Sequence, residues 1–150
     1  MSRPESSAEI AALYQEMILD HYRRPRNKGT LPDADASVQM RNPNCGDVID
    51  LQVNFSGNNV AELRFSGGGC AISQASASMM TQIVAGKSAS ELEAIRDLFR
   101  ELMLGDATAA ADKRLGSLRA LSGVSRFPAR VKCALLAWNA LDRVLTERRA

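Results

Sequence analysis

The sequence predicts an α+β fold in which a small antiparallel sheet of three strands packs against about five helices. Residues 49–55 and 60–66 alternate apolar and polar side chains on either side of a turn at 56–59, which is typical of a β-hairpin. The segments before and after this hairpin instead show the apolar spacing of amphipathic helices. Strands that are grouped in one part of the chain, with helices elsewhere, favour the α+β class.

Length and composition favour a single domain over residues 1–150, with residues 1–7 as a frayed polar N-terminus. A chain of 150 residues with 45% hydrophobic content can bury a core without disulfides. Nineteen basic and seventeen acidic residues give a net charge of +2 without a sustained basic face, so we expect no nucleic acid and no membrane partner. Three cysteines, an odd number, and the lack of a signal-peptide pattern after Met1 favour a reducing cytoplasm.

The first half of the chain is expected to form a helix and the three strands. Ser6 and Glu9 have the spacing of a capping box, and the helix that begins there ends before Pro25. A short strand over 37–40 precedes the break at 42–44. In the hairpin, one buried face is predicted to carry Ile49, Leu51, Val53 and Phe55 from its first strand and Ala61, Leu63 and Phe65 from its second.

The second half is expected to be helical. A helix over 71–84 would bury Ile72, Ala75, Met79 and Ile83 and turn its serine, glutamine and threonine side chains elsewhere. A second capping-box pattern, Ser88 with Glu91, starts a helix that ends near Gly105. Residues 106–112 could be helical or mobile, and 115–124 are too irregular to assign. The last helix begins at Pro128 and ends near Glu147.

The three cysteines all lie where expected elements begin or end. Cys45 and Asp47 are two residues apart, so in an extended chain they point to the same side. Cys70 follows three glycines, which let the backbone approach an ion closely, and Cys133 lies near the start of the last helix. Three thiols and one carboxylate supply the four ligands of a tetrahedral zinc site, so Cys45, Asp47, Cys70 and Cys133 are candidate zinc ligands.

A structural alternative remains open for each of these residues. Free cysteine is often a small buried hydrophobic residue, and Ala134-Leu135-Leu136 directly after Cys133 favours this interpretation there. Asp47 could be a solvated acid at the start of a strand. No CxxC pair indicates a zinc ribbon or a thioredoxin-like site. His21 is interpreted as an ordinary helix-end residue and Trp138 as core.

Three stretches of the sequence resemble the IscU/NifU-type iron-sulfur assembly proteins. They are Asn42-Pro43-Asn44-Cys45-Gly46-Asp47, Gly67-Gly68-Gly69-Cys70-Ala71-Ile72-Ser73 and Phe127-Pro128-Ala129-Arg130-Val131-Lys132-Cys133. The segment from Leu13 to Asn27, with Asp20-His21-Tyr22 at its centre, is also similar, so the resemblance covers nearly the whole chain. Within this superfamily the sequence looks most like the SufU branch. Lys132 stands where the scaffold-type members have a histidine, and the stretch between Cys70 and Cys133 is longer than in those members.

The resemblance implies a zinc-dependent sulfurtransferase with one zinc ion per chain. Such a protein would accept persulfide sulfur from a SufS-type cysteine desulfurase and deliver it to the downstream iron-sulfur assembly machinery. By family analogy, Cys45 would be the acceptor, while Asp47, Cys70 and Cys133 keep the zinc. Arg130 would assist the active site or contact the partner.

Three other functions use the same side chains. The first is an IscU-type scaffold or carrier, which would hold an iron-sulfur cluster in place of zinc. The second is a structural zinc module, whose usual signature is a closed site with four ligands. The third is a thiol redox enzyme, which is disfavoured because no resolving cysteine lies nearby in the sequence.

Overall fold

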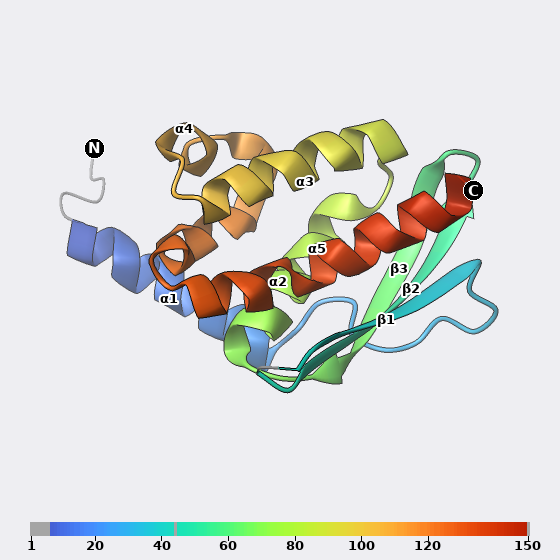
Figure 1. Ribbon diagram of the computed structural model, residues 1–150, viewed down its shortest axis with the longest axis horizontal. Coiled ribbons are helices and arrows are strands. Elements are labelled where there is room, and N and C mark those ends of the chain that lie inside the picture. Colours follow the sequence, from blue (N-terminus) through green and yellow to red (C-terminus); the bar gives the residue numbers. More distant parts are fainter. Residues whose placement is uncertain (1–6, 44, 150) are drawn as a thin grey trace.

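Six helical segments and three strands make up the computed structural model, which describes residues 7–43 and 45–149 (Figure 1). The α+β class and the three-stranded sheet are therefore confirmed. In chain order the elements are α1 (Ser7–Arg23), β1 (Ala36–Asn42), β2 (Asp47–Ser56), β3 (Asn59–Gly68), α2 (Ala71–Val84), α3 (Ala89–Met103), α4 (Ala107–Ala110), the 3-10 segment η1 (Lys113–Arg126) and α5 (Pro128–Arg149).

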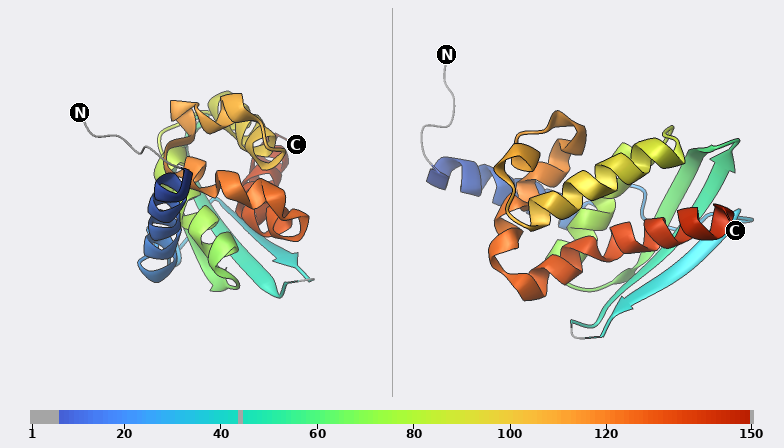
Figure 2. Two further views of the ribbon diagram at one scale, coloured as in Figure 1. Left: turned by 90° about the vertical axis from the view of Figure 1, so that its left-hand side faces the viewer. Right: turned by 45° about the horizontal axis from the view of Figure 1, so that its top comes forward.

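The sheet is a meander in which β2 pairs with both neighbours in antiparallel fashion. Alternate residues of β2, namely Ile49, Leu51 and Val53, are fully buried, as the hairpin pattern predicts. Helices α2 and α5 pack against the sheet, and α5 runs diagonally across it (Figures 1 and 2). The apolar alternation of β2 thus fixes which side of the sheet carries the rest of the fold.

The prediction for β3 is wrong at Ala61. The register shifts between Asn54 and Phe55, so that Phe55 pairs with Val60 while Asn54 pairs with Glu62. Ala61 is the extra residue of this β-bulge and is exposed, whereas Val60 is buried in its place. A bulge reverses the inward and outward alternation, which a simple two-residue period does not predict.

Helix α2 is the central helix, and the prediction of one apolar face is wrong for it. Ser73, Gln74, Ser76, Ser78 and Thr81 are all buried, because α1, α5, η1 and β3 surround the helix. The buried hydroxyl groups have partners: for example, Ser76 Oγ donates to the Ala134 carbonyl at 2.7 Å. Ser76, Ser78 and Thr81 therefore connect α2 to its neighbours instead of facing water, whereas Ser73 and Gln74 form hydrogen bonds within α2 and its N-cap.

The end of α1 joins α2 through a polar contact at His21. His21 Nδ1 lies 2.8 Å from Ser78 Oγ, which also accepts a hydrogen bond from the Arg26 backbone N–H at 2.8 Å. His21 is only 6% exposed, so its imidazole is part of the packing between the end of α1 and α2.

The segment from Gly105 to Arg126 folds into α4 and η1. Asp106 caps α4 by accepting hydrogen bonds from the backbone N–H groups of Thr108 and Ala109. Gly116 interrupts η1 with a φ of 53°, a conformation that glycine adopts easily. The irregular apolar positions of this segment are buried in the core: Leu115, Leu118, Leu121 and Val124.

The remaining predicted helices agree with the structure at their ends and cores. Ser88 and Glu91 form both hydrogen bonds of the capping box that starts α3. Trp138 of α5 is fully buried and packs against the Phe99 ring at 5.9 Å between centroids. Not every large apolar side chain of the helices is buried: Leu13 of α1 is 53% exposed.

The predicted helix cap at Ser6 lies outside the described residues. So does the predicted frayed segment, except for Ser7, which is the first residue of α1. In the part of the chain that the structure describes, no helix combines the length and apolar character needed to cross a membrane.

Candidate metal centre

Three segments that are far apart in the sequence meet at one end of the sheet. They are the β1–β2 turn, the link between β3 and α2, and the first turns of α5 (Figure 1). They bring Cys45, Asp47 and Cys133 together, with one ligand atom of each within 4.8 Å of the other two. Cys70 lies beside this group, with its Sγ 3.8 Å from Asp47 Oδ2.

The β1–β2 turn presents Cys45 at the surface. The Asn42 carbonyl accepts hydrogen bonds from the backbone N–H groups of Cys45, at 3.2 Å, and Gly46, at 2.9 Å. Gly46 has a φ of 70°, and Cys45 is exposed. Cys45 and Asp47 thus approach each other through a tight turn, and the prediction that strand alternation aligns them is wrong.

Asp47 is the first residue of β2 and is fully buried. Its Oδ1 accepts a hydrogen bond from the Cys70 backbone N–H at 2.8 Å. None of the ion pairs between described residues includes Asp47. A buried carboxylate without a cationic side chain fits a metal ligand, because buried charges are normally paired or coordinated.

The glycines before Cys70 allow the β3–α2 link to lie against Asp47. Gly69 has a φ of 148°, and a Cβ atom there would overlap the Asp47 carboxylate. Gly67 is similarly close to the Val48 carbonyl. The close backbone approach that the three glycines predict is therefore present, and the group that the backbone approaches is the Asp47 side chain.

Cys70 is the N-cap residue of α2, as the sequence predicts. Its Sγ accepts a hydrogen bond from the Ser73 backbone N–H at 3.5 Å, and its own N–H is held by Asp47. The Cys70 sulfur therefore lies between the first turn of α2 and the Asp47 carboxylate, which is 3.8 Å away.

Cys133 is fully buried in the second turn of α5. Its Sγ lies 3.3 Å from Cys45 Sγ, 3.6 Å from Asn42 Nδ2 and 3.7 Å from the Ala129 carbonyl oxygen. Burial raises the pKa of the Cys133 thiol, and hydrogen bonds to Cys45, Asp47 and Cys70 raise it further. A divalent cation reverses this preference, because coordination deprotonates a thiol.

Two separations between candidate ligands lie near those around a tetrahedral zinc ion, whereas Cys70 lies outside the group whose ligand atoms are all within 4.8 Å of one another. Ligand atoms at about 2.0–2.3 Å from zinc stand about 3.5–3.8 Å apart in a tetrahedron. The Cys45–Cys133 distance of 3.3 Å and the Asp47–Cys70 distance of 3.8 Å lie close to this range. Three sulfur atoms and one oxygen are also a donor set that zinc accepts.

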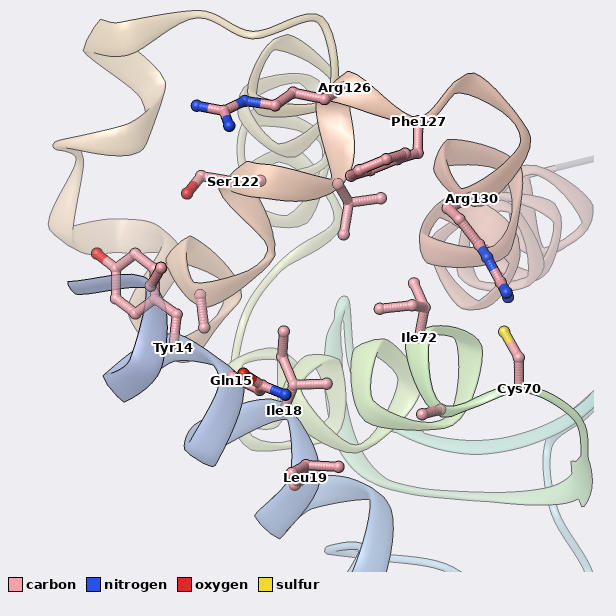
Figure 3. A pocket seen from close by; sticks show the side chains of 15 residues that line it. Tyr14, Gln15, Ile18, Leu19, Cys70, Ile72, Ser122, Arg126, Phe127 and Arg130 are labelled. Atoms are coloured by element: carbon pink, nitrogen blue, oxygen red, sulfur yellow. The ribbon is translucent and has the colours of Figure 1, made fainter. Parts of the chain in front are cut away.

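Arg130 lies one turn before Cys133 in α5 and directs its guanidinium group toward Cys70 (Figure 3). The negative charge of the Cys70 thiolate raises the pKa of Arg130, with smaller contributions from a hydrogen bond to Cys70 and from Cys133. Arg130 is exposed, so its guanidinium group is accessible from solvent. It can stabilise a thiolate or meet a negatively charged group of a partner.

Two features of this region are absent from the sequence-based prediction. Asn42 is buried and donates toward Cys133, although the sequence indicates only a break after the first strand. The other feature is a groove beside Cys70 that is lined by α1, α2, η1 and α5. No sequence pattern joins these four elements, so the groove could not be predicted.

Residues 13–134 match the family model for the NifU-like N-terminal domain. The chain therefore belongs to the NifU-like family of iron-sulfur cluster assembly proteins, which confirms the resemblance in the sequence. The matched segment includes Cys45, Asp47, Cys70, Arg130 and Cys133.

Within this family the chain is similar to proteins named SufU and to proteins named IscU. It is 46% identical over 138 residues to the zinc-dependent sulfurtransferase SufU of Bacillus subtilis, with 91% of this chain and 92% of that protein aligned. It is also 46% identical over 138 residues to the iron-sulfur cluster assembly scaffold protein IscU of Streptococcus pyogenes, covering 92% and 86% of the two chains.

Solved structures agree with this relationship. The FiSufU protein of the SUF system from Fervidobacterium islandicum AW-1 superposes with a TM-score of 0.81 at 32% identity, covering 93% of this chain and 99% of that chain. A crystal structure of a hypothetical protein gives a TM-score of 0.84 at 44% identity, covering 90% and 98%.

Proposed function

We propose that this protein is a zinc-dependent sulfurtransferase that accepts persulfide sulfur from a SufS-type cysteine desulfurase and delivers it to iron-sulfur cluster assembly. Cys45, Asp47, Cys70 and Cys133 would hold one zinc ion, and Cys45 would be the sulfur acceptor. We further propose that residues 1–150 act as one domain in the reducing cytoplasm, where three free thiols stay reduced.

The observation that carries this proposal is the unequal burial of the thiols. Cys45 is exposed in a turn, whereas Asp47 and Cys133 are fully buried and Cys70 is partly buried. The exposed thiol can reach a partner protein while the buried groups stay in place. A closed structural zinc site does not require this asymmetry.

The side chains of this centre support sulfur transfer in a simple way. Bound zinc would keep the thiols deprotonated at neutral pH. The Cys45 thiolate attacks the outer sulfur of the persulfide on the desulfurase cysteine, and that cysteine leaves as a thiolate. Cys45 then carries the persulfide. Exchange of Cys45 for a ligand from the docked desulfurase would confine this reaction to the complex.

The first test is the metal content of the anaerobically purified wild-type protein, measured by elemental analysis together with an absorption spectrum. We expect about one zinc per chain and no visible chromophore. The Asp47→Ala variant should contain little zinc. Wild-type protein without metal would overturn the proposal and return the cysteines to a structural role.

The second test is desulfurase turnover. The zinc-loaded protein should increase sulfide production by its cognate desulfurase, and Cys45→Ser should abolish the increase. Arg130→Gln should lower it, while Arg130→Lys should restore part of it if charge beside Cys70 is what matters. No increase with zinc-loaded wild type would overturn the sulfurtransferase role.

An iron-sulfur scaffold is the second candidate, because the similarity to the IscU of Streptococcus pyogenes is as high as the similarity to SufU. The same three thiols could ligate a cluster. The scaffold predicts iron with acid-labile sulfide and a coloured, oxygen-sensitive protein, so the metal analysis separates the two functions.

A further inference from the structure

A groove with a volume of about 840 Å³ opens next to the metal centre, between α1, α2, η1 and the start of α5 (Figure 3). Its walls are mainly apolar, with Ile18, Ile72 and Phe127 turned toward its interior. Phe127 is 60% exposed, so an apolar ligand would cover it. This volume and this apolar lining are typical of a pocket for a small organic molecule, since such pockets have volumes of about 300–1,000 Å³.

The groove carries positive charge without a compensating carboxylate. Its lining includes Arg126 and Arg130 but no aspartate or glutamate. In the ranges that the structure describes, neither guanidinium forms an ion pair with a carboxylate. Arg130 is directed to Cys70, whereas Arg126 lies on the opposite rim, at the end of η1 (Figure 3). An anionic group on a ligand would therefore meet Arg126.

One end of the groove reaches the metal centre. Cys70 contributes to both sites: it lines the groove, and its Sγ lies 3.8 Å from Asp47 Oδ2. An oxygen of the same carboxylate lies within 4.8 Å of Cys45 Sγ. The sulfur atoms of Cys70 and Cys45 thus share the Asp47 carboxylate as a neighbour, which connects this end of the groove to the proposed sulfur acceptor.

We propose that the groove binds a small thiol with an apolar chain and an anionic end, and that this molecule takes the sulfur from Cys45. The apolar walls hold the chain, Arg126 binds the anion, and the thiol faces Cys70 and Arg130. This inference rests on the proposed sulfurtransferase function and adds the chemical class of the acceptor.

The transfer step needs no further reagent. The thiolate of the bound molecule attacks the outer sulfur of the Cys45 persulfide, a new sulfur-sulfur bond forms, and Cys45 leaves as a thiolate. With a dithiol, the second thiol attacks the inner sulfur of the new persulfide. Hydrogen sulfide leaves and a cyclic disulfide remains.

Binding is tested first, on the zinc-loaded full-length protein without a desulfurase. The two probes are lipoate, which ends in a carboxylate, and lipoamide, which ends in a neutral amide and is otherwise identical. Both contain a closed disulfide ring, so neither has a free thiol that could bind the zinc. Lipoate should perturb the NMR signals of Ile72 and Phe127 and bind about two- to fivefold more tightly than lipoamide, the range that one exposed ion pair provides. Phe127→Ser should weaken both ligands.

Arg126→Gln should remove the preference for lipoate, and Arg126→Lys should retain it. Arg143→Gln is the matched control, because Arg143 is an exposed arginine of α5 outside the groove. Equal affinity for the two ligands, or an unchanged preference in Arg126→Gln, would overturn the proposal. Unchanged affinity of the Phe127→Ser variant for both ligands would overturn it as well.

Transfer is tested with protein whose Cys45 has been loaded chemically with polysulfide. Dihydrolipoate should release sulfide faster than dihydrolipoamide by the same factor as in binding, and Arg126→Gln should make the two rates equal. Both probes carry the same dithiol, so loss of zinc affects them alike. Equal rates with wild type overturn the acceptor proposal. Failure of Cys45 to carry sulfur at all overturns the sulfurtransferase function instead, while the binding result stands.

Discussion

Cys45 Sγ lies 3.3 Å from Cys133 Sγ, although the first thiol is exposed in a turn and the second is fully buried in α5. Both thiols are free, since a disulfide requires a distance of about 2.0 Å. The two neighbouring thiols therefore differ in what they contribute to the fold. Cys133 is part of the buried packing of α5, whereas Cys45 is not buried.

The first prediction concerns the stability of the metal-free protein. In the presence of a chelator, Cys45→Ala should change the free energy of unfolding by no more than about 0.5 kcal/mol, as is usual at an exposed site. Cys133→Ala should cost about 1–2 kcal/mol, because it leaves a small cavity in the buried part of α5. Urea unfolding measures both values. Equal losses would contradict the unequal burial of the two residues.

The second prediction concerns the glycines before Cys70. Gly69→Ala should destabilise the protein by roughly 1–3 kcal/mol and lower its zinc content, since the new Cβ overlaps the Asp47 carboxylate and φ is positive. Gly68→Ala is the matched control, because a Cβ there meets no atom within 4 Å. Thermal unfolding and zinc analysis of the two variants provide the measurement. Similar behaviour of both variants would show that Asp47 tolerates the displacement.

These glycines show how far the sequence determines the centre. The run of three glycines before Cys70 indicates a close backbone approach, and the structure has it. The partner in that approach is Asp47, which is 22 residues before Gly69 and becomes its neighbour only through the β2–β3 pairing. The candidate ligands could therefore be selected from local motifs, whereas their mutual distances depend on the sheet register.

The errors in the fold prediction have the same origin. Ser76 and Ser78 of α2 are buried because α5 and the end of α1 supply their hydrogen-bond partners. In isolation, a helix rich in serine predicts a solvent-exposed face. Local propensity and period are correct for where α2 begins and ends, but burial is decided by elements from other parts of the chain.

The third prediction concerns removal of the metal. The proposed zinc ion connects the β1–β2 turn, α2 and α5, so it should stabilise the folded state. At free zinc of 100 times the dissociation constant the gain is about 2.7 kcal/mol, which corresponds to roughly 5–10 °C in the unfolding temperature of a protein of this size.

Calorimetry with and without a chelator measures this shift. Asp47→Asn provides the control, because it keeps the shape of the side chain and removes the charge that binds the cation. We expect the chelator to lower the unfolding temperature of the wild type and to affect Asp47→Asn much less. A chelator-sensitive Asp47→Asn variant would exclude Asp47 as a required ligand.

The last prediction concerns pH and His21, which lies far from the cysteines in the sequence and packs against Ser78. Burial lowers the pKa of His21 below its usual 6.5, the charge of Arg26 lowers it further, and Asp20 opposes both effects. The unfolded chain therefore binds a proton more readily than the folded protein. The stabilising contribution of neutral His21 is complete above about pH 6.5 and is lost as the pH falls below that value.

Urea unfolding of the metal-free protein between pH 8 and pH 5 tests this prediction, and the chelator removes any contribution from proton-linked release of zinc. Wild type should lose stability through this range. His21→Gln, which keeps a hydrogen-bonding side chain but does not titrate, should show a flatter profile. The difference between the two profiles reports His21 alone, because both proteins contain the same neighbouring groups, Asp20 and Arg26. Identical slopes would mean that His21 titrates equally in the folded and unfolded states, which its burial between α1 and α2 does not allow.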